Sequence, residues 1–361
     1  MNHDAASPRI DGPVLITGGA GFIGTNVAAR LLDLGHEVIV FDNMARAGVA
    51  ENLRWLSRRG GSRLRTCLAD TRDPDVLRDV VRRAGCVFHF AAQVAVTSSL
   101  EDPLNDFEIN LRGTLNLLEA IRDERRRIPL VFASTNKVYG ALPDIAMSQT
   151  ATRYQPEDEN LRRHGIDETR PLDFCSPYGC SKGGADQYIL DYARSFGLAA
   201  VVLRMSCIYG PHQCGTEDQG WVAHFLLRAL QGRPITIYGD GLQVRDILYV
   251  DDLVDALLIC GEDRDVLRGR AFNMGGGPRN TISLQELLNE IAWLDGRVPR
   301  VLREKWREAD QRWFVADTRR FADATGWRPR VDAKDGIGRL FRWLAKESAE
   351  EEILTAGAHA A

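Results

Sequence analysis

Long apolar runs are absent from this sequence of 361 residues, and so is any CxxC pair of cysteines. No run approaches the roughly 20 apolar residues that a membrane-spanning helix needs. The N-terminal segment MNHDAASPRIDG also lacks the apolar core of a secretory signal. Seven cysteines, an odd number, favour reduced thiols over a disulfide framework or a zinc site. We therefore expect a cytoplasmic protein without a metal ion and without membrane contact.

The sequence also lacks a strong excess of charge of either sign. Its 46 lysines and arginines nearly balance 50 acidic residues, and the formal net charge is −4. Such a surface has no general attraction for nucleic acids, so the arginine-rich stretches RDERRR and SRRGGSRLR are interpreted as solvated faces. Hydrophobic residues make up 44% of the chain, which is enough for one large domain or two ordinary ones.

A strand pattern, three spaced glycines and an amphipathic helix pattern follow one another between Pro13 and Leu32. The glycines are Gly18, Gly21 and Gly24. In such a motif one glycine permits the tight turn, one lets backbone amides approach a pyrophosphate, and one lets the helix pack closely on the strand. The helix N-terminus adds N–H groups and a partial positive charge for the anion. The pattern predicts a dinucleotide-binding site.

Asp42 ends the second strand pattern, HEVIVFD, and stands eighteen residues after Gly24. An acidic side chain at this place suits a ribose 2′-hydroxyl and repels a 2′-phosphate, which predicts NAD rather than NADP. Arg46 is close enough to Asp42 to tolerate a phosphate, so NADP stays the alternative at this point.

Strand and helix patterns keep alternating up to Ser206. This α/β alternation predicts a doubly wound parallel sheet of the Rossmann type, with ligands beyond the carboxyl ends of its strands. The predicted units are an NAD-binding domain over 12–206, rejoined by about 244–277, a mainly substrate-binding smaller domain over 207–346, and a flexible tail over 347–361. The cleft between the two domains is the expected substrate site.

Tyr178 and Lys182 are spaced i, i+4 in the segment SPYGCSKGGADQYILDYA. On a helix both side chains lie on one face and can meet the same ligand. A tyrosine titrates near 10, so it must be shifted down by roughly three pKa units to accept a proton near neutral pH. A lysine ammonium and a cationic nicotinamide ring can stabilise the phenolate. Downstream of a dinucleotide site, this pair predicts an acid–base device.

Together these motifs resemble the extended short-chain dehydrogenases/reductases, the family of nucleotide-sugar epimerases and dehydratases. The resemblance is carried by GGAGFIG, the strand end at Asp42, LAD, HFAAQ, NLRGTLNLLEA, STNKVYG, YGCSK and GDGLQVRD, and it covers nearly the whole chain. It implies that Thr135 hydrogen-bonds the reacting hydroxyl, that Tyr178 is the base, and that Lys182 holds both Tyr178 and the nicotinamide ribose. It also implies that Arg245 and Arg307 clamp the substrate diphosphate, for which a guanidinium fork is well shaped.

The resemblance implies further site residues around both ligands. Besides the three glycines, Asp42, Tyr178 and Lys182, the expected cofactor contacts are Phe22, Ile23, Asn43, Arg46, Asp70, Thr71, Ala91, Ala92, Gln93 and Asn110. The expected substrate contacts are Asn136, Cys207, Gln219, Trp221, Arg245 and Arg307.

The two residues after Thr135 bear on the type of reaction. Dehydratases of the family resemble one another in having Asp and then Glu there, whereas this chain has Asn136 and Lys137. Neither can act as a carboxylic acid, so elimination of water is disfavoured. Oxidation of a ring carbon followed by re-reduction on the opposite face remains, and its net result is an isomerisation.

Within the epimerases, the segments STNKVYG, ATRYQPEDEN, DQGWV and READQRWFVAD look most like those of the CDP-paratose 2-epimerases, also called CDP-tyvelose epimerases. The resemblance implies a nucleotide-diphosphate sugar as substrate and inversion at C2. A 4-epimerase of a UDP-hexose is the alternative within the family, followed by another NAD-dependent sugar-nucleotide oxidoreductase or dehydratase, and a dinucleotide-binding protein without turnover is the alternative outside catalysis. We expect a homodimer or homotetramer.

Overall fold

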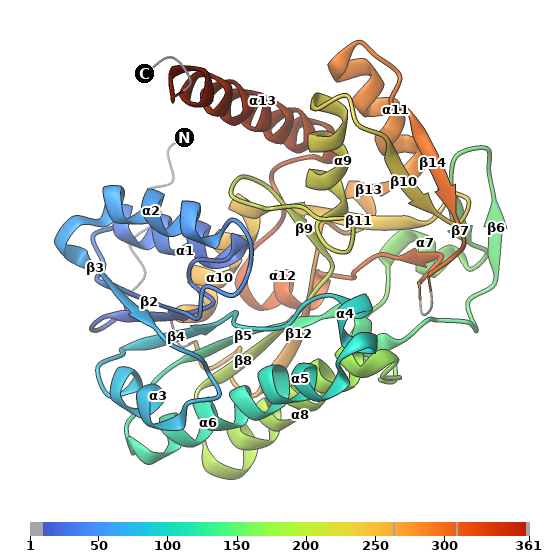
Figure 1. Cartoon of the computed structure of the whole chain (residues 1–361). Helices are drawn as coiled ribbons and strands as arrows, with labels where there is room; N and C mark the ends of the chain where they lie inside the picture. The colour runs from blue at the N-terminus through green and yellow to red at the C-terminus, as the bar shows by residue number, and fades with distance from the viewer. Residues whose placement is uncertain (1–9, 263, 308–309, 359–361) are drawn as a thin grey trace.

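The computed structural model describes residues 10–262, 264–307 and 310–358, and its larger domain is built on one parallel sheet (Figure 1). This sheet has seven strands in the order β12-β8-β5-β4-β1-β2-β3, and all of its pairings are parallel. In chain order its strands are β1 Val14–Thr17, β2 Val38–Asp42, β3 Leu64–Leu68, β4 Cys86–His89, β5 Leu130–Thr135, β8 Ala200–Met205 and β12 Arg270–Met274. The Rossmann-type architecture predicted from the alternating patterns is therefore confirmed.

Helices cover both faces of this sheet, as Figure 1 shows. One face carries α1 (Phe22–Asp33), α2 (Val49–Gly60) and α10 (Val250–Gly261), and the other carries α3 (Pro74–Val81), α6 (Gly113–Asp123) and α8 (Ser176–Phe196). Successive strand residues point to opposite faces, so Val14 and Ile16 join one apolar cluster while Leu15 joins the other. Burial on both sides explains why central strands such as β1 and β2 are nearly continuous apolar runs, whereas the edge strand β3 is mostly exposed.

The smaller domain is a second group of strands and helices. β11 (Val244–Tyr249) lies at the centre of one small sheet and pairs with β9 (Cys207–Tyr209), β13 (Thr281–Ser283) and β15 (Trp313–Phe314). β10 (Ile235–Tyr238) pairs with β14 (Val301–Glu304). These strands pack against α9 (Trp221–Leu230), α11 (Leu284–Asp295) and α13 (Ala333–Ala358) around a separate apolar cluster.

The segment 244–277 is divided between the two sheets. α10 packs on the larger sheet and β12 pairs with β8 at its edge, but β11 pairs with β9 in the smaller domain. The expectation that the whole of 244–277 rejoins the larger domain is therefore not met at β11. The reason is that the chain leaves the large sheet after Met205, and β9 then offers β11 a free edge in another direction.

The helix α13 extends into the end of the chain, and the flexibility of the tail stays a prediction. A flexible tail is predicted from residue 347, whereas α13 continues to Ala358. Residues 347–358 contain mainly alanine, glutamate, leucine and isoleucine, and most of these are good helix formers, so the helix has no reason to stop at residue 347. Residues 359–361 lie outside the described part of the chain.

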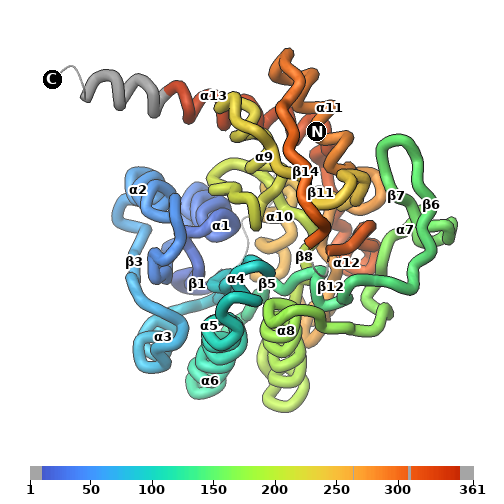
Figure 2. The backbone as a smooth tube through the Cα atoms, turned by 45° about the vertical axis from the view of Figure 1, so that its right-hand side comes forward, coloured from blue at the N-terminus to red at the C-terminus, as the bar shows by residue number. Residues whose placement is uncertain are grey.

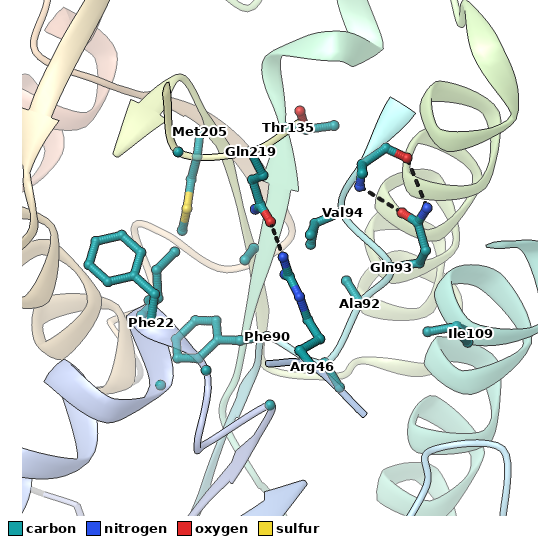
Figure 3. Close-up of a pocket in the computed structure, with 18 of the residues that line it drawn as sticks. Phe22, Arg46, Phe90, Ala92, Gln93, Val94, Ile109, Thr135, Met205 and Gln219 are labelled. Carbon is teal, nitrogen blue, oxygen red and sulfur yellow. Dashed lines mark hydrogen bonds between the residues drawn. The ribbon is translucent and has the colours of Figure 1, made fainter. Parts of the chain in front are cut away.

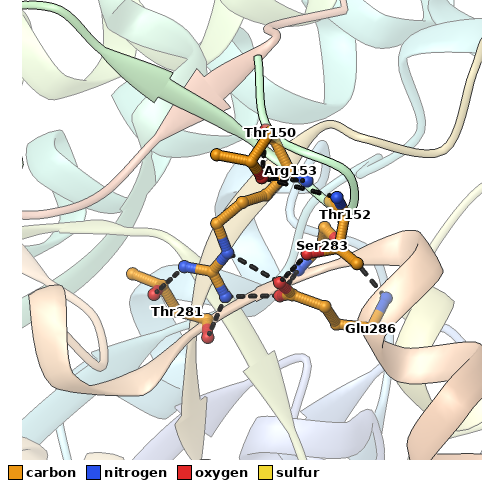
Figure 4. A network of polar contacts seen from close by, with 6 residues as sticks. All are labelled: Thr150, Thr152, Arg153, Thr281, Ser283 and Glu286. Atoms are coloured by element: carbon orange, nitrogen blue, oxygen red, sulfur yellow. Dashed lines mark hydrogen bonds and ion pairs between the residues drawn. The ribbon is translucent and has the colours of Figure 1, made fainter. Parts of the chain in front are cut away.

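A hairpin of β6 (Met147–Gln149) and β7 (Tyr154–Pro156), followed by α7 (Glu159–His164), lies on the side of the molecule away from α2 and α3 (Figure 2). Arg153 fixes it to α11 through Glu286, with 2.7 Å between Arg153 Nε and Glu286 Oε1 (Figure 4). Glu286 also belongs to the capping box of α11, whose N-cap is Ser283. The hairpin and the smaller domain are thus joined by one polar network.

The remaining elements are short. They are η1 (Gly61–Arg63), α4 (Val96–Glu101), α5 (Pro103–Phe107), the π-helical turn η2 (Glu108–Arg112), the 3₁₀ turns η3 (Asn136–Tyr139) and η4 (Pro278–Asn280), and α12 (Arg319–Thr325). Within the described ranges, no helix has both the length and the apolar character needed to cross a membrane. The same residues contain no group of three or more His, Cys, Asp or Glu side chains that could hold a metal ion.

Candidate active site

The glycine turn between β1 and α1 is built for close backbone contacts. Gly18 has a φ of 67°, and a Cβ there would lie 2.7 Å from the backbone nitrogen of Ala91 on the neighbouring strand connection. A Cβ on Gly24 would lie 2.3 Å from the carbonyl oxygen of Gly18. A larger residue at either position would force the turn, the helix or the neighbouring strand apart.

A cavity of about 560 Å³ opens beyond the carboxyl ends of the strands and extends from this turn to the smaller domain (Figure 3). Most of the residues singled out from the sequence line it: Gly18, Gly21, Phe22, Ile23, Gly24, Asp42, Asn43, Arg46, Asp70, Thr71, Ala91, Ala92, Gln93, Thr135, Asn136, Tyr178, Lys182, Cys207, Gln219 and Trp221. Asn110, Arg245 and Arg307 are not among the lining residues.

The glycine end of the cavity fits a dinucleotide pyrophosphate. α1 begins at Phe22, and its N-cap, Gly21, places no side chain over the first turn. The N–H groups of that turn therefore face the cavity, where Gly21, Phe22, Ile23 and Gly24 all form part of the wall. These residues would hold NAD here, and the cofactor would supply a reversible acceptor for a hydride.

Asp42 has two backbone partners at the end of β2. Its carboxylate accepts hydrogen bonds from the N–H of Ala20, at 3.1 Å, and from the N–H of Met44, at 2.9 Å. Nearby, Asn43 donates to Asp70 at 2.7 Å, and the hydrogen bonds from Arg72 lower the pKa of Asp70 to about 2. Asp42 and Asp70 therefore present two carboxylates at the end of the cavity where the ribose is expected.

Arg46 crosses the cavity instead of standing beside Asp42. Its guanidinium donates to Gln219 Oε1 at 2.5 Å, which joins the first domain to the loop before α9 (Figure 3). Burial lowers the pKa of Arg46, and the Asp42 carboxylate counteracts this effect. In this structure the side-chain partner of Arg46 is therefore Gln219.

Asn110 lies behind the cavity wall and acts through Gln93. Its side-chain oxygen accepts from the N–H of Gln93 at 2.9 Å, and its nitrogen donates to the carbonyl of Gln93 at 3.1 Å. Asn110 is 1% exposed and holds the loop after β4, while its expected role as a direct cofactor contact stays a prediction. The π-helical turn Glu108–Arg112 carries it into this position.

Tyr178 and Lys182 lie on the buried face of α8 where this helix meets the end of β5. Burial raises the pKa of Tyr178 to about 12, while a hydrogen bond with Thr135 and the charge of Arg46 act in the opposite direction. Burial lowers the pKa of Lys182 to about 7, opposed by the carboxylates of Asp186 and Asp106. The lysine nitrogen lies 4.1 Å from the centroid of the Phe132 ring.

Behind this pair lies a buried ion pair that the sequence patterns did not reveal. Asp186 is fully buried and receives two hydrogen bonds of 3.0 Å from Arg204 and one of 2.8 Å from Ser134. One signal could have identified it, because Asp186 follows Lys182 by one helical turn and so lies on the same face of α8 as the expected acid–base pair. The pair fixes α8 against β5 and β8, beneath the expected base.

Beyond Thr135, charged groups gather at the edge of the cavity. Asp310 accepts a hydrogen bond of 2.7 Å from Arg245 and lies 3.9 Å from the Lys137 nitrogen. Arg307 donates to the carbonyl of Glu217 at 3.1 Å and lies 3.9 Å from the centroid of the Tyr238 ring. Both expected phosphate clamps therefore have protein partners close to the lining residues Cys207 and Gln219, without lining the cavity themselves.

Gln311 is a second residue at this edge that the sequence patterns missed. It is fully buried and accepts a hydrogen bond of 3.1 Å from the Asn136 side chain. The segment READQRWFVAD contains Asp310 and Gln311 and marks the resemblance to 2-epimerases, but no local pattern indicates which of its residues reach the site.

Comparisons with known proteins agree with this geometry. Residues 14–275 match the model of a family described as the NAD dependent epimerase/dehydratase family. A CDP-paratose 2-epimerase of Salmonella typhi is 44% identical over 342 residues, which cover 92% of this chain and 99% of that protein. A putative UDP-glucose 4-epimerase of Methanocaldococcus jannaschii is 32% identical over 92% of this chain and 98% of its own.

Solved structures share the fold over the same length. A Thermus thermophilus UDP-glucose 4-epimerase in complex with NAD is 34% identical, with a TM-score of 0.75, covering 92% of this chain and 98% of that one. A Thermotoga maritima UDP-glucose 4-epimerase with UDP-glucose is 30% identical, with a TM-score of 0.79, covering 93% of this chain and 99% of that one. The cofactor is NAD, as Asp42 predicts. The chain therefore belongs to the NAD dependent epimerase/dehydratase family, as an NAD-dependent isomerase.

Proposed function

We propose that this protein inverts C2 of a nucleotide-linked hexose, as an epimerase similar to the CDP-paratose 2-epimerase that is 44% identical to it. The observation that carries epimerisation is the pair Asn136 and Lys137 directly after Thr135, and the 44% identity to a 2-epimerase is what supports C2. These two positions offer an amide and an ammonium instead of the Asp and Glu carboxyl groups of the dehydratases, so they supply no carboxylate base for the loss of water. Epimerisation needs none.

Tyr178 is the proposed proton acceptor for the reacting hydroxyl. With a pKa of about 12, its phenol holds the proton firmly unless cations stabilise the phenolate. Thr135 contributes a hydrogen bond to the tyrosine, and Lys182 shares the buried face of α8 with it. The ammonium of Lys182, together with the positive ring of the bound cofactor, would stabilise the phenolate and so lower the pKa of Tyr178.

Asn136, Cys207, Gln219 and Trp221 are the proposed contacts of the sugar and the nucleotide, since all four line the cavity beyond Thr135. Arg245 and Arg307 are the proposed partners of the diphosphate. A diphosphate would replace the carboxylate of Asp310 on Arg245 and that of Asp218 on Arg307, 3.2 Å away. Such an exchange substitutes one anion for another without leaving a cation unpaired.

The identity of the product tests the proposal. The NAD-loaded protein is incubated in D₂O with CDP-paratose and, in parallel, with UDP-glucose, and the products are examined by NMR. Inversion at C2 without deuterium at that carbon is the expected result, because the hydrogen stays within the site. Inversion at C4 would assign the protein to the 4-epimerases instead, and deuterium at C2 would point to deprotonation by a base.

A further inference from the structure

Asn136 can present either of two chemically opposite atoms to the cavity. It lies directly after Thr135 at the end of β5, lines the cavity and is 9% exposed. Its side-chain oxygen only accepts hydrogen bonds, and its nitrogen only donates them. The atom that faces the cavity therefore decides whether a sugar must donate or accept at this point.

Gln311 determines the orientation of Asn136. One end of the Gln311 amide lies 2.6 Å from the carbonyl oxygen of Gly140, and a carbonyl only accepts, so that end must be the nitrogen. The other end, the oxygen, lies 3.1 Å from Asn136 and must receive a donor. Asn136 therefore directs its nitrogen to Gln311, and its oxygen lies on the side of Thr135, 3.5 Å from the hydroxyl.

The reverse orientation is costly. Turning Gln311 would bring its oxygen against the Gly140 carbonyl, which would leave buried polar groups without hydrogen-bond partners. Turning Asn136 alone would bring two oxygens together at Gln311. The orientation of the Gln311 amide therefore fixes the orientation of the Asn136 amide.

The backbone around Gln311 is held firmly as well. The next residue, Arg312, accepts a hydrogen bond of 2.9 Å from the N–H of Val244 through its carbonyl, and Trp313 begins β15 alongside β11. The Arg312 guanidinium lies 5.4 Å from the centroid of the Tyr154 ring, on the hairpin that the network of Figure 4 fixes to α11. Gln311 therefore has little freedom to follow the side chain of Asn136.

We propose that Gln311 is a positioning residue that fixes Asn136 as a hydrogen-bond acceptor, and that the substrate sugar donates to Asn136 from a second ring hydroxyl. The first ring hydroxyl, which reacts, is the one that Thr135 and Tyr178 would contact. A sugar with fluorine or hydrogen in place of the second hydroxyl leaves the Asn136 oxygen with only the Thr135 hydroxyl, 3.5 Å away, as a donor. The inference rests on the proposed function because it takes the ligand to be a nucleotide sugar.

Equilibrium binding tests this role without depending on which carbon is inverted. Calorimetry with the NAD-loaded protein measures the Kd of CDP-paratose, of UDP-glucose, and of analogues in which one ring hydroxyl is replaced by fluorine. One analogue should bind wild type about tenfold more weakly than its parent sugar does, and that difference should vanish in Asn136→Ala. Equal binding of all analogues to wild type would overturn the inference.

A double-mutant cycle separates positioning from a general effect on the fold. As a single substitution, Gln311→Met should weaken binding of the parent nucleotide sugar about tenfold. When Asn136→Ala is already present, it should have almost no further effect on that binding. Losses that simply add in the double variant would show that Gln311 acts through the fold, and no loss in Gln311→Met would also contradict the proposal. If Gln311→Met does not fold, the fluoro analogues on wild type and Asn136→Ala still decide.

The two proposals fail in different ways. Inversion at C4 instead of C2 would overturn the proposed function while the coupling between Asn136 and Gln311 could still be observed. A normal product together with additive losses would overturn only the inference about Gln311.

Discussion

The two ends of the cavity are built by different means. The dinucleotide end consists largely of backbone, with Gly18 and Gly24 allowing close approach and the N–H groups of α1 facing the ligand. The sugar end depends on side chains from distant parts of the chain, with Asn136 in the cavity wall and Arg245 and Gln311 behind it. A backbone site depends on the absence of side chains, whereas a side-chain site depends on hydrogen bonds between residues far apart in sequence.

Tyr178 lies where the two ends meet, so its removal should have the largest effect. Tyr178→Phe should lower kcat by about 10³-fold, because the proton acceptor is lost while the ring still fills its buried place. NAD content, measured after denaturing the purified protein, should stay close to that of wild type. Retention of most of the wild-type kcat would show that another group takes the proton.

Gly24 tests the claim that the dinucleotide end is made of backbone. Gly24→Ala should weaken NAD binding by about 100-fold, equal to about 2.7 kcal/mol, since its Cβ meets the Gly18 carbonyl at 2.3 Å. Gly338→Ala is the matched control. It is also a helical glycine, but a Cβ there would approach nothing closer than 4.0 Å. Similar NAD affinity in both variants would contradict the close-approach argument.

Arg245 tests the sugar end without touching the dinucleotide end. Arg245→Ala should raise KM about tenfold and also lower kcat, since a misplaced diphosphate misplaces the sugar. NAD affinity should not change. A matching loss of NAD affinity would mean that the two ends are not separate, and an unchanged KM would remove Arg245 from the substrate site.

Asp246 should make the free energy of unfolding depend on pH, which is a smaller effect. Burial raises its pKa to about 6, while hydrogen bonds from Ser206 and the N–H of Gly277 act against this rise. Between about pH 4 and pH 6 the folded protein thus holds a proton that the unfolded chain releases. The free energy of unfolding should fall as pH rises through this range.

Asp246→Asn isolates this contribution. Chemical denaturation at several pH values should show a shallower fall in this variant than in wild type, whatever its overall stability. Parallel curves for the two proteins would mean that Asp246 ionises normally in the folded state.

The same contrast explains what the sequence could predict. The glycine turn, Asp42 and the spacing of Tyr178 and Lys182 are local patterns, and each lies within one or two adjacent elements. The residues of all three patterns line the cavity. The parallel sheet could likewise be predicted, because buried parallel strands read as apolar runs between amphipathic helices.

The remaining features depend on tertiary contacts that no local pattern encodes. Gln311 reaches Asn136 because β15 pairs with β11 at Val244 and Trp313, a pairing that joins segments about seventy residues apart. Arg46 is near Asp42 in sequence, yet its partner is Gln219 in the other domain. Asn110 acts through Gln93, which becomes visible only once η2 lies behind the loop. When the partner of a residue lies on another element, the sequence neighbours of that residue do not reveal the partner.

The position of β12 has a consequence for how the protein is made. This strand completes the edge of the large sheet beside β8, yet it is synthesised after β9, β10 and β11 of the smaller domain. A growing chain that has just passed residue 206 therefore exposes the unpaired edge of β8 until the ribosome has delivered residue 274. A gene fragment ending at the first domain boundary would encode a sheet whose β8 edge is open, and an open edge favours aggregation.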